Sequence, residues 1–352
     1  MYTKKIFGIK DMALWTRFDL LKFIFISLIE VGFFVIADGL FQVPFTPVAL
    51  VGTAVAFIIG FQSNAAYGRI WEARKIWGAI VNSSRTFGMM TQDFINNDHS
   101  KHPIDEAEIQ EEIKILTYRH IAWLTALRYA MRQTRPWEYV MNENTNKEWA
   151  KKVFVPEFNI PFNDAIAPYL SDEDKTYLKD KKNKQTALLY LQSHHLKKLK
   201  KRHLLWEFSF LELENVLEEL FTHQGKSERI KNFPYPRQFA SLLHYFTWIF
   251  ILIIPIALAG QFYELGLKLA IKAPGIDLWF VWLSIPFSLA IMWIFHTMNR
   301  IGRVGENPFE GSANDVPIST ISRGIEIDLR QNLGEKIEDI PKQFEAKNNT
   351  QF

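Results

Sequence analysis

The chain has 352 residues and carries 41 Lys and Arg against 38 Asp and Glu, which gives a formal net charge of +3. This small excess excludes a strong electrostatic attraction to nucleic acid, so no nucleic-acid partner is predicted. Cysteine is absent from the sequence, which excludes a disulfide framework and metal sites held by thiolates.

The N-terminal region begins with several basic residues and becomes apolar over residues 23–41. It has no small-residue cleavage site, and its apolar part contains Glu30 and Asp38, so we do not expect a cleaved signal peptide. We interpret residues 23–41 as a membrane span whose carboxylates face protein or water, because lipid-facing carboxylates are costly. The alternative is an amphipathic helix of a soluble core.

Three further segments contain no Asp, Glu, Lys or Arg, namely residues 39–68, 238–263 and 278–299. Each is long enough to cross a bilayer, which takes about 20 apolar residues. With residues 23–41 they predict four spans, joined in pairs by the short connectors 39–46 and 264–277. Basic residues gather at the opposite ends of the spans, so the positive-inside rule places both termini and the long middle section in the cytoplasm.

The middle section has the composition of a soluble helical domain, with apolar residues at helical spacing: Ile113, Leu116, Ile121, Leu124 and Leu127. The proline-bounded stretch 153–162 is predicted to be a loop, and the polar tail beyond Leu333 is predicted to be mobile. The chain therefore divides into an N-terminal segment with the first two spans, a cytoplasmic helical domain, the third and fourth spans, and a C-terminal segment, at residues 1–62, 63–235, 236–304 and 305–352.

Residues 50–78 read LVGTAVAFIIGFQSNAAYGRIWEARKIWG, with no turn signal between an apolar half and a charged, Trp-rich half. Thr46 is placed to cap this helix, and Pro47 suits its first turn. The sequence therefore predicts one helix that starts near Thr46, crosses the bilayer and continues beyond it.

Two stripes of residues run along the apolar half of this helix. Small residues recur every four positions at Gly52, Ala56 and Gly60, a pattern that lets helices approach closely in membranes. The neighbouring stripe contains Thr53, Phe57 and Phe61. These three side chains could pack in a core, or they could line a pore as a hydrophobic constriction that gates by dewetting. Their spacing alone leaves both interpretations open.

A motif of charged and aromatic residues follows these stripes: Asn64, Tyr67, Arg69, Trp71, Glu72, Arg74 and Trp77. A second motif follows the last span and contains Asn307, Pro308 and Phe309. Both resemble the signature of the bestrophin family of ion channels in its bacterial form, although Ile70 stands where the signature has Trp. We expect Arg69, Glu72 and Arg74 to pair three residues apart or with neighbouring subunits.

The resemblance implies a homopentamer with one axial pore, whose second span lines a narrow neck with three rings of apolar side chains. Counted along the first motif, these rings correspond to Phe61, Phe57 and Thr53. Thr53 replaces an aliphatic residue of the family, which makes the outer ring more polar. The resemblance also implies that the C-terminal segment packs on neighbouring subunits.

Eukaryotic members of the family bind calcium just after the second motif. Here only Asp315 corresponds to one of their carboxylates, and Ser312 takes the place of another. Calcium takes about six to eight oxygen ligands, commonly several of them carboxylates. We therefore keep Asp315 as a weak calcium candidate and predict no calcium control, no metal site and no cofactor.

The most basic stretch, HHLKKLKKRH at residues 194–203, is either a solvated helix face or part of a basic ring that concentrates anions. The sequence contains no HExxH motif and no glycine-rich phosphate loop. Nothing in it indicates an enzyme.

The residues and the resemblance together predict an all-α membrane protein with four spans and a helical cytoplasmic domain, assembled as a homopentamer among the lipids of the inner membrane. Its predicted function is passive conduction of small monovalent ions, with chloride favoured by the basic stretch and the positive net charge. One alternative is a cation channel of the same fold. Another is a secondary transporter that uses Glu30 or Asp38 as a coupling carboxylate.

Overall fold

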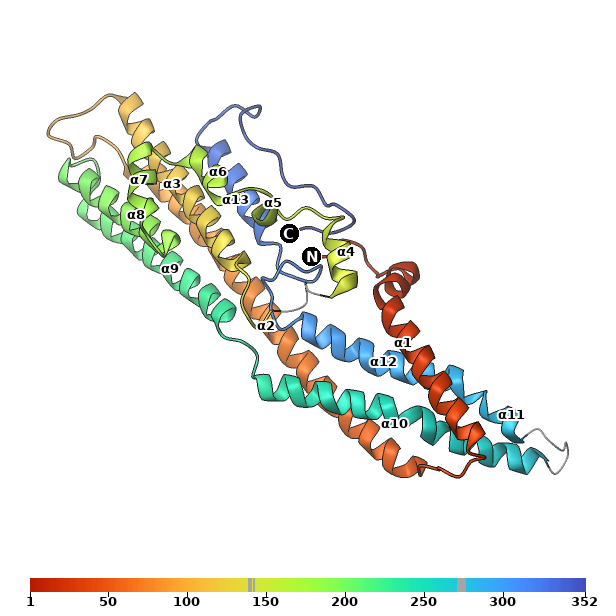
Figure 1. Ribbon diagram of the computed structural model, residues 1–352. Coiled ribbons are helices and arrows are strands. Elements are labelled where there is room, and N and C mark those ends of the chain that lie inside the picture. The colour runs from red at the N-terminus through yellow and green to blue at the C-terminus, as the bar shows by residue number, and fades with distance from the viewer. Residues whose placement is uncertain (139–140, 142, 271–276) are drawn as a thin grey trace.

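The computed structural model describes the whole chain except residues 139–140, 142 and 271–276, and it is built of helices (Figure 1). The described residues form no strand beyond isolated bridges. In chain order the helices are α1 (Ile9–Ile36), α2 (Phe45–Phe94), α3 (Glu106–Arg132), α4 (Asn144–Ala150), α5 (Pro156–Asn159), α6 (Phe162–Ile166), η2 (Ala167–Tyr169), α7 (Asp172–Lys179), α8 (Lys184–Lys201), α9 (Glu207–Asn232), α10 (Arg237–Ala270), α11 (Asp277–Val281), α12 (Ser284–Val304) and α13 (Ile318–Asn332).

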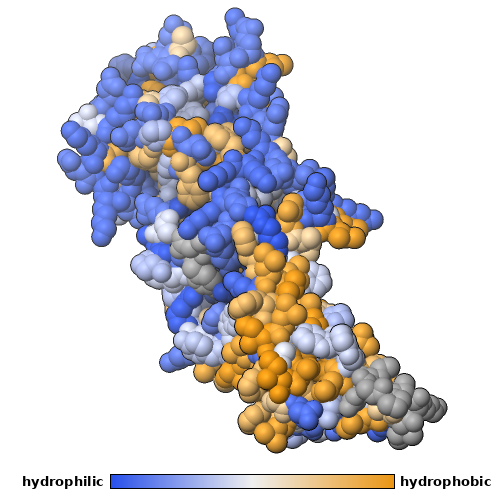
Figure 2. All heavy atoms as spheres, turned by 45° about the vertical axis from the view of Figure 1, so that its right-hand side comes forward, coloured by the Kyte–Doolittle hydropathy of each residue, from blue (hydrophilic) through white to orange (hydrophobic). Residues whose placement is uncertain are grey.

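The molecule is elongated, with an apolar half at one end and a polar half at the other (Figure 2). The apolar half contains α1, α10, α11, α12 and the first part of α2, and the remaining helices form the polar half (Figure 1). Helix α2 is unbroken over 50 residues and belongs to both halves. It begins at Phe45, after Pro44 at the N-cap and with no side-chain cap, so the predicted cap at Thr46 is wrong by two residues.

Among the described residues, three helical segments are long and apolar enough to cross a membrane: α2, α10 and Leu278–Val304. Helix α1 does not reach that level, because it carries Asp19, Lys22 and Glu30. It nevertheless packs into the apolar half, where Phe23, Val31 and Phe34 are buried.

The boundaries of the apolar helices differ from the prediction in two places. Helix α10 extends to Ala270, so the predicted connector 264–277 is partly helical, and residues 271–276 lie outside the described residues. The predicted span 278–299 is divided into α11 and α12, and Pro286 lies in the first turn of α12, where a missing N–H is tolerated.

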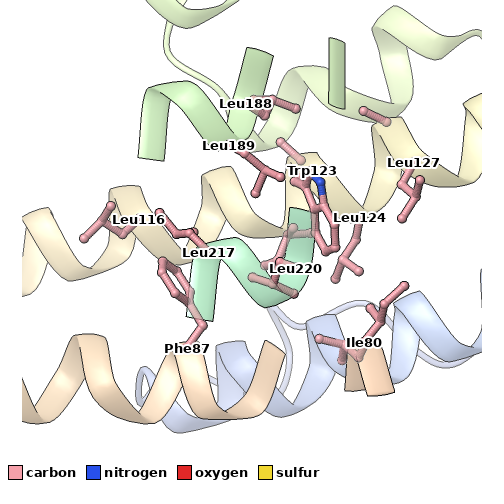
Figure 3. Packing of buried hydrophobic residues seen from close by; sticks show 14 of the residues in the cluster. Ile80, Phe87, Leu116, Trp123, Leu124, Leu127, Leu188, Leu189, Leu217 and Leu220 are labelled. Carbon is pink, nitrogen blue, oxygen red and sulfur yellow. The ribbon is translucent and has the colours of Figure 1, made fainter. Parts of the chain in front are cut away.

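The polar half has one large core between α2, α3, α8 and α9 (Figure 3). Phe87 of α2 points toward Leu116 and Leu217, and Trp123 lies between α8 and α9. The indole N–H of Trp123 donates to Gln224 Oε1 at 3.0 Å, which satisfies the one polar group of this side chain in the core. The C-terminal half of α2 is therefore fixed by soluble-type packing.

Two expectations for irregular segments are wrong. The stretch 153–162 contains the short helix α5 and the start of α6 instead of a plain loop. The tail beyond Leu333 folds back on the polar half instead of staying free of it. Its last residue, Phe352, is buried against Arg132, and Thr350 forms a bridge with Tyr2 near the N-terminus.

The small stripe of α2 serves two different surfaces. A Cβ atom at Gly52 would lie 2.7 Å from the ring of Phe250, so this glycine allows α10 to approach closely within the chain. Ala56 is exposed, and a Cβ at Gly60 would meet nothing within 4 Å. Only the last two positions are therefore open to another copy of the helix.

We expect Gly52→Ala to lower the free energy of unfolding by about 1–3 kcal/mol, because the added methyl group displaces the buried Phe250 ring. Thermal unfolding in detergent measures this change. Gly225→Ala on α9 is the matched control, since its Cβ would meet nothing within 4 Å. Equal midpoints for the two variants would contradict the close approach of α2 and α10.

Candidate functional site

One face of α2 in the apolar half is buried and the opposite face is exposed. Val55 and Ile59 pack in the core with residues of α10 and α12. On the exposed face, Phe57 and Phe61 show 67% and 60% of their surface. Their rings meet edge to face with centroids 4.6 Å apart. The structure therefore brings these two predicted residues together on a surface that their own chain leaves uncovered.

Thr53 lies one turn before Phe57 on the same exposed face. Its hydroxyl donates a hydrogen bond to the Ala49 carbonyl oxygen at 2.9 Å. The helix thus satisfies the hydroxyl hydrogen, which reduces the polarity that Thr53 adds to the surface formed with the two phenylalanines.

The exposed face continues along α2 beyond the apolar half. Asn64 is exposed, and the rings of Tyr67 and Trp71 stack at a centroid distance of 6.4 Å. Arg74 and Lys75 follow on the same exposed side. One face of a single helix therefore changes from aromatic to cationic, and we call residues 53–75 of this face the α2 stripe.

Arg69 fixes the point where α2 leaves the apolar half. Its guanidinium donates to three carbonyl oxygens, those of Glu306 at 2.7 Å, Ile230 at 3.0 Å and Phe233 at 2.8 Å. Beside it, Gln62 donates to Glu306 Oε1 at 2.8 Å. These bonds tie α2 to the end of α9 and to the segment after α12.

The first predicted alternative, pairing of Arg69 with Glu72 along the helix, is therefore wrong, and pairing with neighbouring subunits stays a prediction. Arg69 is occupied by backbone carbonyls, and Glu72 accepts from Arg229 of α9 at 2.7 Å. Gln62 and Glu306 form a pair that was not predicted from the sequence. The available signal was Gln62 itself, a polar side chain in an apolar segment that requires a partner once it is buried.

The two sequence motifs meet in the structure. Trp77 is fully buried, and its ring lies 6.4 Å from that of Phe309. The carbonyl oxygen of Pro308 accepts from the Val316 N–H at 3.2 Å, and Asn307 Nδ2 donates to Glu310 at 3.2 Å. The second motif is thus a tight turn that packs against α2, whereas Trp71 of the first motif stays exposed.

Asp315, the calcium candidate, is buried and surrounded by donors. Its Oδ2 accepts from the Gly311 N–H at 2.5 Å and lies 3.2 Å from Arg132 Nη1, and its Oδ1 is bonded to the Ser312 hydroxyl. Arg132 therefore supplies the positive charge that compensates Asp315. In the described part of the chain, no group of three or more acidic, His or Cys side chains is arranged to hold a metal ion.

Glu310, in the same turn, has a perturbed pKa. Burial raises the pKa from 4.5 to about 7, against the hydrogen bond from the Met141 N–H, which lowers it. A raised pKa means that folding favours the protonated carboxyl. The contribution of the Glu310 carboxyl to the free energy of unfolding is therefore complete below about pH 4.5, and it is lost as the pH rises through 7.

We expect Glu310→Gln to be more stable than the wild type at pH 8, by about 3 kcal/mol, and close to it at pH 5, because the amide stays neutral at both values. Thermal midpoints at the two pH values measure the difference. Glu173→Gln, at an exposed carboxylate, is the control. Parallel pH profiles for wild type and Glu310→Gln would argue against a neutral buried carboxyl.

Two of the five lysines and arginines in the basic stretch 194–203 pair with carboxylates. Arg202 pairs with Glu108 and Glu112, and Lys200 Nζ lies 2.6 Å from Glu207 Oε1. Lys197, Lys198 and Lys201 are exposed on the same stretch, so its interpretation as a solvated helix face or as part of a basic ring stays a prediction.

The two candidate coupling carboxylates differ in position. Glu30 lies half-buried on α1 in the apolar half. Asp38 lies beyond the end of α1 in an exposed turn with φ +51°, a conformation that Asp tolerates better than most residues. Only Glu30 is therefore within the helical part of the apolar half.

Comparisons with known proteins agree with this architecture. The family model of the bacterial/fungal bestrophin protein matches residues 18–331. The chain is 25% identical over 286 residues to the voltage-dependent anion channel-forming protein YneE of Escherichia coli (strain K12), covering 81% of this chain and 75% of that protein. It is 24% identical over 293 residues to the voltage-dependent anion channel-forming protein RSc3414 of Ralstonia nicotianae, covering 82% and 78%.

A crystal structure of a bacterial bestrophin homolog from Klebsiella pneumoniae has a TM-score of 0.70 and 20% sequence identity, and the match covers 91% of this chain and 98% of that one. The likeness shows that the two chains share a fold over nearly their whole lengths. Since the family model also spans most of the sequence, this chain belongs to the bacterial/fungal bestrophin family.

Proposed function

We propose that this chain forms an anion-conducting channel in which Thr53, Phe57 and Phe61 of several copies surround a common axis as a hydrophobic neck. The observation that carries the proposal is the α2 stripe, which is aromatic in the apolar half and cationic beyond it. A pore wall uses both parts, one to gate by dewetting and one to attract ions.

The open small residues support assembly around α2. Ala56 and Gly60 neighbour the phenylalanines along α2; Ala56 is exposed, and a Cβ added at Gly60 would meet nothing within 4 Å. Small residues at this spacing let helices of different subunits approach closely. The assembly we propose is a homopentamer, with the C-terminal segment packing on neighbouring subunits, as the family resemblance implies.

The charge of the α2 stripe favours anions. Arg74 and Lys75 lie at its polar end, where a ring of cations would raise the local anion concentration. The relatives named above as anion channel-forming proteins support this choice. The basic stretch 194–203 adds the exposed Lys197, Lys198 and Lys201 to the positive charge of the polar half. Chloride is the small monovalent anion we propose.

The proposed topology has four spans, formed by α1, α2, α10 and the pair α11–α12. The polar half and both termini then lie in the cytoplasm, and the channel lies in the inner membrane. Basic residues near the polar half support this orientation, among them Lys4, Lys5, Lys10 and Arg303.

The reversal potential of purified protein in planar bilayers under a KCl gradient tests the function. A potential near the chloride equilibrium value is expected. A potential near the potassium value would keep the pore but show a cation channel. Absence of current from a verified pentamer would overturn the channel proposal and favour the transporter alternative.

A further inference from the structure

A cavity of about 350 Å³ lies where the helices of the apolar half reach the polar half. It is distant in sequence from the α2 stripe, and no residue of that stripe lines it. Helices α1, α10 and α12 supply most of its wall, with polar or aromatic side chains: Lys22, His244, Trp248, His296, Arg300 and Arg303. The segment before and at the start of α4 closes it from the polar half.

The cavity is at the level where a membrane surface would lie. Arg300 and Arg303 belong to the last turns of α12, and His244 belongs to the first turns of α10, so both helices pass from one half to the other here. Trp248 lines the cavity, and Trp15 lies beneath Arg300 at 4.2 Å from its guanidinium carbon. Tryptophan is enriched at this level of membrane proteins.

Arg300 is held rigidly in the wall. Its guanidinium pairs with Asp19 Oδ2 at 2.9 Å and Glu143 Oε2 at 2.6 Å, and it donates to Thr145 Oγ1 at 2.5 Å. A charged side chain fixed by contacts from both α1 and the start of α4 is a preorganised feature of the cavity and not a mobile surface group.

The cavity has an excess of positive charge. Lys22 Nζ lies 3.5 Å from Asp19 Oδ1, and Arg303 Nη2 lies 3.5 Å from Glu143 Oε1. Arg300, Lys22 and Arg303 are thus three cations that share two carboxylates, those of Asp19 and Glu143. The side chain of Lys22 is 60% exposed, so it can turn toward an anion that enters the cavity.

His296 supplies an unsatisfied polar group. Its side chain is only 9% exposed, and its Nδ1 has no hydrogen-bond partner, with Asp19 Oδ2 at 3.7 Å. The imidazole is held between the rings of Phe23 and Trp248. A buried polar nitrogen without a partner is costly, and in its Nδ1–H tautomer it can donate to an anionic oxygen.

The surface beside the cavity is apolar. Further along α1, Leu21, Phe25 and Leu28 are exposed and follow one side of the helix toward the far end of the apolar half. A ligand with one anionic group and an apolar chain would fit both features. An inorganic anion would use only the cationic cavity and not the apolar surface of α1.

We propose that this cavity binds the phosphate of an anionic phospholipid, with Lys22 and Arg303 contacting the phosphate oxygens, His296 donating from Nδ1, and the acyl chains lying along α1. The lipid belongs to the leaflet next to the polar half. This site does not depend on the channel proposal, because it uses none of the residues of the α2 stripe.

Native mass spectrometry of the assembled protein in an uncharged detergent tests the proposal with two lipids of equal acyl chains, phosphatidylglycerol and phosphatidylcholine. We expect preferential binding of phosphatidylglycerol. Lys22→Gln should weaken that binding about fivefold, the effect of one cation near an anionic membrane surface. Lys10→Gln, an exposed lysine on the same helix outside the cavity, is the matched control and should change it little.

A second variant, His296→Phe, keeps an aromatic ring in the wall and removes the nitrogen, so it should also weaken phosphatidylglycerol binding. Equal binding of the two lipids, or equal effects of Lys22→Gln and Lys10→Gln, would overturn the proposal. Glycerol 1-phosphate is added as a soluble competitor. Displacement at the same concentration as the intact lipid would assign the cavity to a free phosphate ester and overturn the lipid assignment.

Discussion

Replacing Phe57 and Phe61 together by alanine is expected to raise the single-channel conductance severalfold. The two exposed rings fill the surface that we propose as the neck, and their edge-to-face contact makes them one continuous apolar patch. Removing both rings widens the constriction and lowers the cost of keeping water in it, so an ion loses less hydration on passing. Single-channel recording in planar bilayers measures the change.

The matched control is Phe25→Ala on α1. This phenylalanine lies in the apolar half and is 66% exposed, as Phe57 is, but it belongs to a different helix. It should leave the conductance unchanged. An unchanged conductance for the double variant, in protein whose assembly is verified by size, would refute the assignment of the neck.

Asp315→Ala is expected to lower the free energy of unfolding by about 3–5 kcal/mol, because it leaves Arg132 buried with one fewer carboxylate. The Gly311 N–H and the Ser312 hydroxyl lose their acceptor as well. Thermal unfolding in detergent, with EDTA and with calcium, measures both stability and any response to the ion. The loss should be the same in the two conditions, since the partner of Asp315 is a guanidinium.

Asp328→Ala is the comparison for this variant. Asp328 also pairs with an arginine, Arg85, at 2.6 Å, but both side chains are partly exposed. Such a pair contributes about 1 kcal/mol or less. If wild type gained stability from calcium and Asp315→Ala did not, Asp315 would be a metal ligand and the calcium prediction would be wrong.

The course of α2 could be predicted from the sequence because it depends on local features. The segment lacks a turn signal, its apolar part is free of charge, and its polar part has residues with good helix propensity. The partners of Arg69 could not be predicted in this way. They are carbonyl oxygens at the end of α9 and after α12, and any residue type presents a carbonyl, so the sequence carries no sign of them.

In the candidate site too, local features could be predicted from the sequence and tertiary contacts could not. Periodicity places Thr53, Phe57 and Phe61 on one face of α2, but it does not tell whether the chain covers that face. The answer depends on how α10 and α12 pack, and Gly52 is the residue that brings α10 to the other side. The folded tail was missed for a related reason, because a few apolar residues, among them the buried Ile340 and Phe352, anchor a segment that is mostly polar.

The unbroken length of α2 has a mechanical consequence. Its 50 residues form a rod about 75 Å long, held near its middle by the three bonds of Arg69. Along the helix axis, Phe57 lies about 18 Å from Arg69 and Phe94 lies about 37 Å from it, at a rise of about 1.5 Å per residue. Because the distal half of α2 is packed against α3, α8 and α9, a displacement there would move this core with the helix, and the unbroken rod would carry it to the aromatic rings at about half its size.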